Sequence, residues 1–533
     1  MTAAAYEETV HPDGRHELTP AAQAALDDSP IYNEDLAPVR IEQRTWSTYA
    51  YMALWIGMSV NIPSWTLAAG LIALGMDWVQ AVFTVMLGNV IVLVPMLLIS
   101  HAGTKYGIPY PVFARAAFGV IGANLPALIR AGVACGWFGI QTWIGGGAIF
   151  FLLAAIFGEG SWWTTAGTLA IGFGDPQPWT LWLSFIIFWA INLAIVLKGM
   201  NTLRIFESWS APFLIVISVA LTVYMVMQAG GLGPILAQES GFGGWTGEFW
   251  AIFFPSLMAM IAFWSTLSLN MPDFTRFGRS QRDQTIGQAL GLPTTMTVFA
   301  ILAVFTASAA TIVYAASSGV DVWNPVALVA EIGNPVVIIV ALFAIALATL
   351  TTNVAANLVS PSYDFSNTFP KLISFRTGGI ITAIISVLIQ PWYLISNPEV
   401  YIFTWLGFYG GGTGAIAGVL IADYWWVRRT KLRLADLFRT DGGAYKYAAG
   451  WNWRALVALA VGIILAVGGA YTAPGTQGPF PADGLIPFLK PLYDYSWVVG
   501  LVAGFLVYAG LHMISPVTER GPAEEVTPSP EMA

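Results

Sequence analysis

The chain has 533 residues, of which 56% are hydrophobic and only 10% are charged, and its net charge is −8. Soluble domains carry about 25% charged residues, so this composition excludes a soluble domain and predicts an all-α polytopic membrane protein. The acidic balance gives no indication of nucleic-acid binding, and the single cysteine, Cys135, excludes an intramolecular disulfide.

The chain begins with a polar, acid-rich segment, residues 1–40, which we expect to be a disordered cytoplasmic tail. We expect no cleavable signal peptide, because this segment has no apolar core. Apolar runs of about 20 residues follow, each long enough to cross a bilayer as a helix. The twelve predicted spans are approximately 47–72, 78–101, 120–156, 179–198, 205–229, 247–271, 286–317, 331–359, 377–396, 399–426, 453–472 and 495–514.

Lysine and arginine residues set the expected orientation. With both termini in the cytoplasm, 21 of the 22 Lys and Arg lie on the cytoplasmic side, and only Lys490 lies outside. Cytoplasmic loops of membrane proteins carry such an excess of basic residues. The sequence therefore predicts a multi-pass plasma-membrane protein with both termini inside, a basic cytoplasmic loop at 427–452 and a second disordered cytoplasmic tail at 517–533.

Polar residues and a proline interrupt the first span. Asn61 is followed by Pro63, which should kink or unwind the helix at this point. Five spans later the segment 262–274 repeats these features, with Asn270 followed by Pro272. Broken first helices in two halves indicate an inverted-repeat secondary transporter with its site at the bilayer midplane.

This repeat divides the chain into a transport core and additions to it. We expect the core at 41–426, with inverted repeats at about 47–229 and 247–426, and two further helices within 453–516.

The third span, 120–156, contains a tryptophan and an amide within an apolar stretch. Trp137 and Gln141 are four residues apart, so on an α-helix they lie about 40° apart and roughly 6 Å along the axis. Both side chains then face one space, where a ligand ring could stack on the indole and form hydrogen bonds with the amide. The alternative for this pair alone is an interfacial Trp and a Gln that bridges two helices.

The eighth span, 331–359, holds the densest polar patch. Ala348, Thr351 and Thr352 are spaced i, i+3 and i+4 on one face, which would align two hydroxyls with a backbone carbonyl. The alternative is that the threonines bond back to carbonyls of the preceding turn. Asn357 lies well over 100° around the helix from these hydroxyls, so an ion face and a ligand face would be distinct.

Ionisable groups are scarce in the predicted spans. No Asp, Glu or Lys falls at mid-membrane by this assignment, whereas a proton relay usually needs one. The sequence shows no metal-ligand or catalytic-triad cluster, so we do not expect an enzyme. Neutral carbonyl and hydroxyl oxygens suit a hard monovalent cation such as Na⁺.

Seven motifs, in order, resemble those of the nucleobase:cation symporter-1 family, most closely its bacterial hydantoin, allantoin and uracil permease branch. They are GWFGIQTWIGG (136–146), NMPDFTRFGRS (270–280), TTNVAANLVSP (351–361), ISFRTGG (373–379), QPWYLI (390–395), YIFTWL (401–406) and ADYWWVRR (422–429). The resemblance runs from about Val39 to about Phe438. It implies a fold like that of sodium-coupled amino-acid transporters, with a 5+5 inverted repeat and two appended C-terminal helices.

The resemblance also implies a ligand site. A planar heterocycle would lie between the indoles of Trp137 and Trp264, with amide side chains at its polar edge and the family's extracellular gate above it. The residues implied to line this site are Trp137, Gln141, Trp264, Asn357, Asn61 and Leu406. Phe263 replaces a Gly of the hydantoin permease beside the second indole.

A cation site is implied in the same way. Na⁺ would be bound by the backbone carbonyls of Gly57, Val60 and Ala348 and by the hydroxyls of Thr351 and Thr352. The hydantoin permease has Ser at the first threonine position, and Thr keeps its oxygen.

From these observations we expect a monomeric secondary active symporter that imports a nucleobase or related cyclic ureide with a cation, Na⁺, by alternating access. Allantoin, uracil and hydantoin define the expected class of substrate. One alternative is a proton-coupled purine or cytosine permease of the same family. Another is a passive channel or facilitator, which would need a continuous pore lined by polar residues, whereas the sequence indicates a single group of polar residues among aromatic ones.

Overall fold

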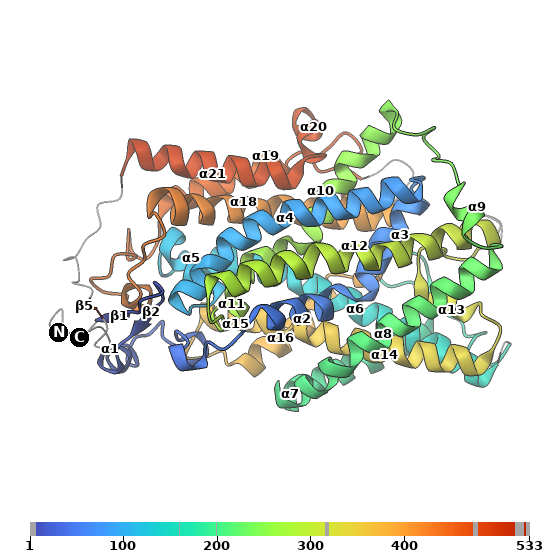
Figure 1. The fold of residues 1–533 in the computed structure, drawn as a ribbon, viewed down its shortest axis with the longest axis horizontal. Coiled ribbons are helices and arrows are strands. Elements are labelled where there is room, and N and C mark those ends of the chain that lie inside the picture. The colour runs from blue at the N-terminus through green and yellow to red at the C-terminus, as the bar shows by residue number, and fades with distance from the viewer. Residues whose placement is uncertain are drawn as a thin grey trace.

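The computed structural model describes residues 7–158, 160–198, 200–314, 319–472, 478–516 and 527–528. It is an elongated bundle of helices, most of which run along its length, and the first and last described segments, near residues 8 and 528, lie side by side at one end of the bundle, called here the end with the termini (Figure 1).

Among the described residues, seven helical segments are long and apolar enough to span a membrane. They are α4 (Trp78–Tyr106), α6 (Asn124–Phe157), α10 (Gly247–Asn270), α12 (Gln281–Val313), the pair α14 (Pro335–Asn357) and α15 (Val359–Thr368), the stretch Val400–Val427 that contains α18 (Gly407–Ile421), and α21 (Ser496–Ile514). Two π-helical stretches, Val400–Leu406 and Ala422–Val427, flank α18.

One further span is broken. Helices α2 (Thr48–Ser59) and α3 (Ile62–Ala73) meet at an angle of 60°, as expected from Pro63 in the first predicted span. Shorter apolar helices complete the bundle, and these are α7 (Trp179–Lys198), α8 (Met200–Gln228), α16 (Phe375–Leu388) and α19 (Trp453–Val467).

Short elements connect and cap these helices. The short α-helices are α1 (Pro20–Leu26), α5 (Tyr110–Phe118), α9 (Leu232–Leu236), α11 (Pro272–Thr275), α13 (Pro325–Ala330), α17 (Pro391–Leu394) and α20 (Lys490–Tyr493). The short 3₁₀ turns are Glu34–Leu36, Ile41–Gln43, Ala435–Phe438 and Pro487–Leu489. The strands are β1 (Glu8–Val10), β2 (His16–Leu18), β3 (Thr168–Leu169), β4 (Gln177–Pro178) and β5 (Thr527–Pro528), in the sheet orders β2-β1-β5 and β3-β4.

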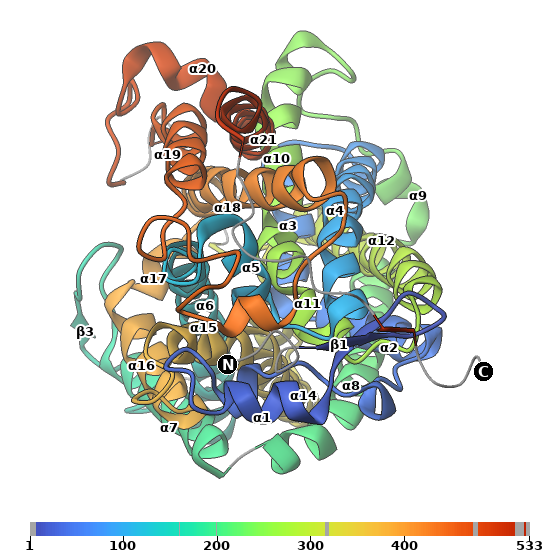
Figure 2. The same cartoon turned by 90° about the vertical axis from the view of Figure 1, so that its left-hand side faces the viewer.

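The N-terminal segment differs from the disordered tail expected up to residue 40. Its described residues form β1, β2 and α1, and Figure 2 shows α1 and β1 in front of the helix ends. Leu18, Leu26 and Leu36 are buried in a hydrophobic cluster with the end of the bundle, and the Ser29 hydroxyl donates to the Phe438 carbonyl at 2.6 Å. These few apolar residues order a segment that is polar on average. The C-terminal tail, 517–533, lies outside the described residues except for β5.

The second expected break comes at the end of α10 instead of within it. α10 continues to Asn270, and Pro272 begins the short α11. The Ser265 and Ser268 hydroxyls donate to the carbonyls of Ala262 and Ser265, each at 2.7 Å. These polar side chains therefore bond to the preceding turn of the same helix and do not interrupt it. The expected correspondence between the two broken helices is therefore only approximate.

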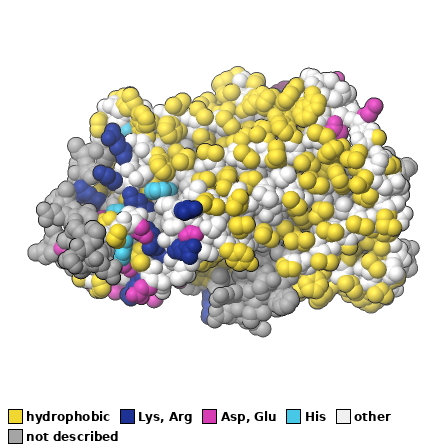
Figure 3. All heavy atoms as spheres, in the orientation of Figure 1, with side chains coloured by type: hydrophobic (Ala, Val, Ile, Leu, Met, Phe, Trp, Pro, Cys, Tyr) yellow, Lys and Arg dark blue, Asp and Glu magenta, His cyan; other side chains and the backbone are white. Residues whose placement is uncertain are grey.

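Charged and hydrophobic side chains occupy different parts of the face shown in Figure 3. Lys and Arg gather at the end that holds the chain termini, whereas hydrophobic side chains cover most of the remaining face. Together with the long apolar helices, this distribution is that of a multi-pass membrane protein.

Candidate substrate and cation site

The break between α2 and α3 is built around Asn61. Its Oδ1 accepts a hydrogen bond from the Ser64 backbone N–H at 2.8 Å, and its Nδ2 donates to the Met58 carbonyl. Asn61 thus caps the start of α3, a role typical of Asn before a helix that has Pro in its first turn. The amide oxygen and the amide nitrogen of Asn61 are therefore both hydrogen-bonded to the backbone, whereas the predicted role of Asn61 is to pair with the ligand.

The same break frees the two carbonyls of α2 that are predicted to bind a cation. In a continuous helix Gly57 would accept from the N–H of Asn61, but this N–H donates to the Ser59 carbonyl at 3.0 Å. The N–H of Ser64, the helical donor for Val60, donates to the Asn61 side chain. The carbonyls of Gly57 and Val60 therefore lack their helical donors, at the helix end whose dipole favours a cation.

Two buried hydroxyls lie on α14, which contacts α2. Thr351 is 1% exposed and donates to the Ala348 carbonyl at 2.9 Å, so the back-bonding considered in the sequence analysis is present. Thr352 is 7% exposed. A hydroxyl that donates its hydrogen keeps its lone pairs for a cation, so the hydrogen bond is compatible with the predicted ion site.

Trp137, Phe263 and Trp264 form an aromatic cluster in the interior of the bundle, and Gln141 is buried one turn beyond Trp137 on α6. We refer to these four residues as the cage. The Trp137 ring lies edge-to-face against Phe263, with a centroid separation of 5.0 Å and an interplanar angle of 77°. Phe263 makes a second edge-to-face contact with Trp264, at 4.8 Å and 86°. The two indoles predicted to enclose the ligand are therefore linked through Phe263.

Two buried polar atoms of the cage have no hydrogen-bond partner among the described residues. They are Oε1 of Gln141 and Nε1 of Trp264, on side chains that are 4% and 3% exposed. Most buried polar atoms in proteins are paired, so such exceptions call for an explanation. A buried free acceptor on α6 and a buried free donor on α10 match a planar ring that carries both N–H and C=O groups.

Asn357, at the end of α14, is held by a second asparagine. Its Nδ2 donates to Asn353 Oδ1 at 3.0 Å, and Asn353 Nδ2 donates to the Phe138 carbonyl of α6 at 3.1 Å. This chain of amides fixes α14 against α6 and sets the position of Asn357. Sequence reasoning missed Asn353, although it lies one turn before Asn357 in the TTNVAANLVSP motif.

The π-helix Val400–Leu406 covers the cage beside the broken helix. Leu406, predicted at the gate, is fully buried at its end. The Tyr401 hydroxyl donates to the Pro63 carbonyl at 3.3 Å, and its ring lies 6.1 Å from that of Trp137. Tyr401 also was missed by sequence reasoning, although the YIFTWL motif contains it. Wide helical turns of this kind are frequent at functional sites.

Buried charges lie nearer the end with the termini, where α11 and α15 are found (Figure 1). Arg130 and Asp364 form an ion pair at 3.1 Å with both side chains 1% exposed, and Asp273 accepts from the Tyr110 N–H at 2.8 Å. The sequence assignment placed no acid at mid-membrane, counted Arg130 among the cytoplasmic basic residues and gave Asp273 as a helix-end group that could titrate, but it did not identify Asp364 as the partner of Arg130. Asp273 and Asp364 are therefore the carboxylates that could carry a proton if transport were proton-coupled.

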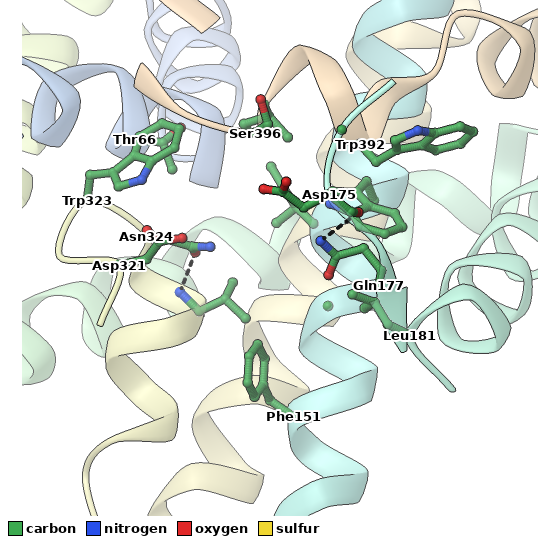
Figure 4. Close-up of a pocket in the computed structure, with 16 residues that line it drawn as sticks. Thr66, Phe151, Asp175, Gln177, Leu181, Asp321, Trp323, Asn324, Trp392 and Ser396 are labelled. Atoms are coloured by element: carbon green, nitrogen blue, oxygen red, sulfur yellow. Dashed lines mark hydrogen bonds between the residues drawn. The ribbon is translucent and has the colours of Figure 1, made fainter. Parts of the chain in front are cut away.

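A separate cavity of about 240 Å³ lies on the other side of the cage, away from the termini. It is lined partly by α6 residues beyond Gln141, including Ile144 and Phe151, and partly by loops (Figure 4). Burial raises the pKa of one lining carboxyl, Asp321, and a hydrogen bond from Trp323 offsets part of the rise. We refer to this space as the outer cavity.

Comparison with known proteins places these features in a family. Residues 38–500 match the family described as permeases for cytosine/purines, uracil, thiamine and allantoin. The chain is 41% identical over 443 residues to the purine-uracil permease NCS1 of Arabidopsis thaliana. This match covers 83% of this chain and 72% of the plant protein. It is 38% identical over 491 residues to the allantoin permease of Bacillus subtilis, covering 91% and 94% of the two chains.

Solved structures agree in fold. The structure of Mhp1 in a closed conformation with bromovinylhydantoin bound has a TM-score of 0.71 and 25% identity, over 92% of this chain and 97% of that one. The inward facing conformation of Mhp1 gives the same TM-score at 24% identity, over 92% and 95% of the two chains. The chain therefore belongs to the nucleobase:cation symporter-1 family, and it is a multi-pass membrane permease, not an enzyme.

Proposed function

We propose that the protein is a secondary active symporter that imports a nucleobase or cyclic ureide of the allantoin, uracil and hydantoin class together with Na⁺ across the plasma membrane. Relatives named as purine-uracil and allantoin permeases support the substrate class. The observation that carries the proposal is the buried cage in which Gln141 Oε1 and Trp264 Nε1 have no hydrogen-bond partner within the described part of the chain.

The chemistry of the cage suits a flat, uncharged ring. Stacking on an aromatic side chain contributes about 1–3 kcal/mol per base, and Trp137 and Trp264 both offer indole faces. The free acceptor of Gln141 takes an N–H of the ring, and the free donor of Trp264 takes a carbonyl. Asn357, positioned by Asn353, supplies a second amide for the polar edge.

Na⁺ is the proposed coupling ion. Its ligands are the carbonyls of Gly57, Val60 and Ala348 and the hydroxyls of Thr351 and Thr352, and the loss of helical donors at Gly57 and Val60 supports this assignment. An ion that joins α2 to α14 next to the cage raises ligand affinity, and the ligand must then raise Na⁺ affinity equally.

The driving force follows from the charge of the ion. One charge moving through 100 mV supplies about 2.3 kcal/mol, and a tenfold Na⁺ gradient about 1.4 kcal/mol more. Together these allow accumulation of roughly several hundred-fold.

The proposed topology has twelve spans with both termini in the cytoplasm, and the protein acts as a monomer. The broken pair, the seven long segments and the four shorter apolar helices supply the spans, with a 5+5 inverted repeat followed by α19 and α21. The gathering of Lys and Arg at the end that holds the termini supports the orientation.

Alternating access requires two closures around the cage. Toward the outside, the π-helix carrying Tyr401 lies against the break at Pro63. Toward the inside, Asn270 on α10 donates to the hydroxyl of Ser360 on α15. We propose that these contacts open in turn and that Na⁺ and ligand together favour the state in which both are closed.

Uptake by cells that express the protein tests the proposal. Radiolabelled uracil, allantoin, hydantoin, cytosine and purines are offered with Na⁺ or with choline at fixed pH. We expect accumulation above equilibrium that requires Na⁺, and its loss in Thr351→Ala plus Thr352→Ala. Uptake that never exceeds equilibrium would indicate a facilitator. Accumulation that ignores Na⁺ but follows the proton gradient would indicate the proton-coupled alternative.

A further inference from the structure

The outer cavity combines aromatic walls with polar groups from several elements. Figure 4 shows Asp321, Trp323 and Asn324 on one side, with Asp175 and Gln177 facing them from the loop before α7. Its volume of about 240 Å³ exceeds that of a water site many times over and is of the order needed by a small heterocycle.

The polar groups left free in this cavity are mainly acceptors. Gln177 Nε2 donates to the Asp175 carbonyl at 3.3 Å, which leaves its Oε1 available. Asn324 Oδ1 accepts from the Val326 N–H at 3.0 Å as the cap of α13. The carboxylates of Asp175 and Asp321 add further acceptor oxygens, although Asp321 also accepts a hydrogen bond from Trp323, and the residues that line the cavity include no Lys or Arg. Such a surface binds a ligand through its N–H groups.

The cavity adjoins the cage through a short series of contacts. Trp323 is 5% exposed and lines the cavity, and its ring lies 6.4 Å from that of Tyr401. Tyr401 in turn lies 6.1 Å from Trp137. Thr66, which also lines the cavity, donates to the same Pro63 carbonyl as Tyr401, at 3.1 Å. The floor of the outer cavity is therefore the outer cover of the cage.

We propose that the outer cavity is a second, weaker binding site, at which a planar heterocycle rich in N–H groups binds against Trp323 and Asp321 before it passes Tyr401 into the cage. The inference rests on the proposed substrate class. Binding is weaker here because only one of the three indoles that line the cavity, Trp323, is buried and the carboxylates stay partly accessible to solvent, whereas both indoles of the cage are buried. Its role is to hold the ligand at the closed gate, which raises the rate of capture at low concentration.

Equilibrium binding separates the two sites. Among uracil, allantoin and hydantoin, the compound with the highest uptake is used as the radiolabelled probe on purified protein. Trp137→Ala removes a wall of the cage and should abolish tight binding, but a weak saturable component should remain. Adding Asp321→Asn to Trp137→Ala should weaken that component about tenfold, the loss expected for one hydrogen bond to a charged group.

Uptake kinetics give an independent measurement. Asp321→Asn alone should raise the KM for uptake several-fold while leaving the maximal rate and the tight dissociation constant unchanged. Glu248→Gln is the matched control, because Glu248 is an exposed acid in the first turn of α10 and does not line the cavity. Asp321 is itself on a loop, so its amide variant keeps the helical bundle intact.

Three results would overturn the inference. The first is the absence of weak saturable binding in Trp137→Ala. The second is weak binding that Asp321→Asn and Glu248→Gln leave equally strong. The third is a change in the Na⁺ concentration needed for half-maximal uptake in Asp321→Asn with the weak component unchanged, which would assign the cavity to the cation. Failure of the proposed substrate class would appear separately, as wild-type protein that takes up none of the three compounds.

Discussion

Replacing Tyr401 with Phe should speed release of ligand from the cage, because its hydroxyl holds the π-helix against the broken helix. The hydroxyl donates to the Pro63 carbonyl at 3.3 Å in a fully buried position. Thr66 donates to the same carbonyl at 3.1 Å, so the variant does not leave this acceptor unpaired. The cost is therefore that of one neutral hydrogen bond, about 0.5–1.5 kcal/mol. The closed state should lose about two- to tenfold in population, with a similar rise in the dissociation rate.

Isotope dilution measures this rate on purified protein loaded with radiolabelled allantoin or uracil in Na⁺. Tyr493→Phe is the matched control, because the Tyr493 hydroxyl donates to the Phe403 carbonyl of the same π-helix at 2.8 Å, but from α20. We expect this control to release ligand at the wild-type rate. Faster release in Tyr493→Phe with an unchanged rate in Tyr401→Phe would refute the assignment of Tyr401 to the outer closure.

Three further predictions use stability or specificity. Asn61→Ala should lower the free energy of unfolding by about 1 kcal/mol, and Asn61→Ser, which keeps a neutral capping oxygen, should lower it by less. Equal losses would contradict the capping role. Thermal unfolding can be followed by labelling of Cys135, the buried sole cysteine. Gly146→Ala places a Cβ 2.7 Å from the α7 backbone and should lower the free energy of unfolding by about 1–3 kcal/mol. Gly147→Ala is the control, because a Cβ at this position has nothing within 4 Å and should leave the stability unchanged. Phe263→Gly should admit hydantoins with bulky substituents in a competition assay, and unchanged selectivity would place Phe263 outside the ligand space.

Much of the fold follows from local sequence. Apolar runs predicted the long helices within a few residues, because bilayer thickness fixes their length. Pro63 marked the first break. Trp137 and Gln141 were expected to face one space; both are buried on α6, and their shared role in binding a ligand stays a prediction. Trp143 is two residues beyond Gln141 and so lies about 160° around the helix from it, and its ring packs against Trp182 of α7 at 5.1 Å.

Features that depend on contacts distant in sequence were missed. Asn270 and Pro272 marked the junction of α10 with α11, but the polar residues before them did not interrupt α10, because the hydroxyls of Ser265 and Ser268 bond to carbonyls within that helix. The N-terminal segment was expected to be disordered because its composition is polar, yet Leu26 and Leu36 pack on the bundle. The ion pair of Arg130 with Asp364 joins residues 234 positions apart, which no local pattern reveals.

The cage and its ligand are tested most directly by the equilibrium dissociation constants of Trp137→Ala and Trp143→Ala, measured with radiolabelled allantoin and uracil on purified protein in Na⁺. Both variants remove an indole from α6, so they share the general cost of losing a large aromatic side chain. We expect Trp137→Ala to lose tight binding by at least the stacking contribution, about 1–3 kcal/mol or roughly five- to 150-fold, and Trp143→Ala to keep it. Tight binding that survives in Trp137→Ala and is lost in Trp143→Ala would contradict the account.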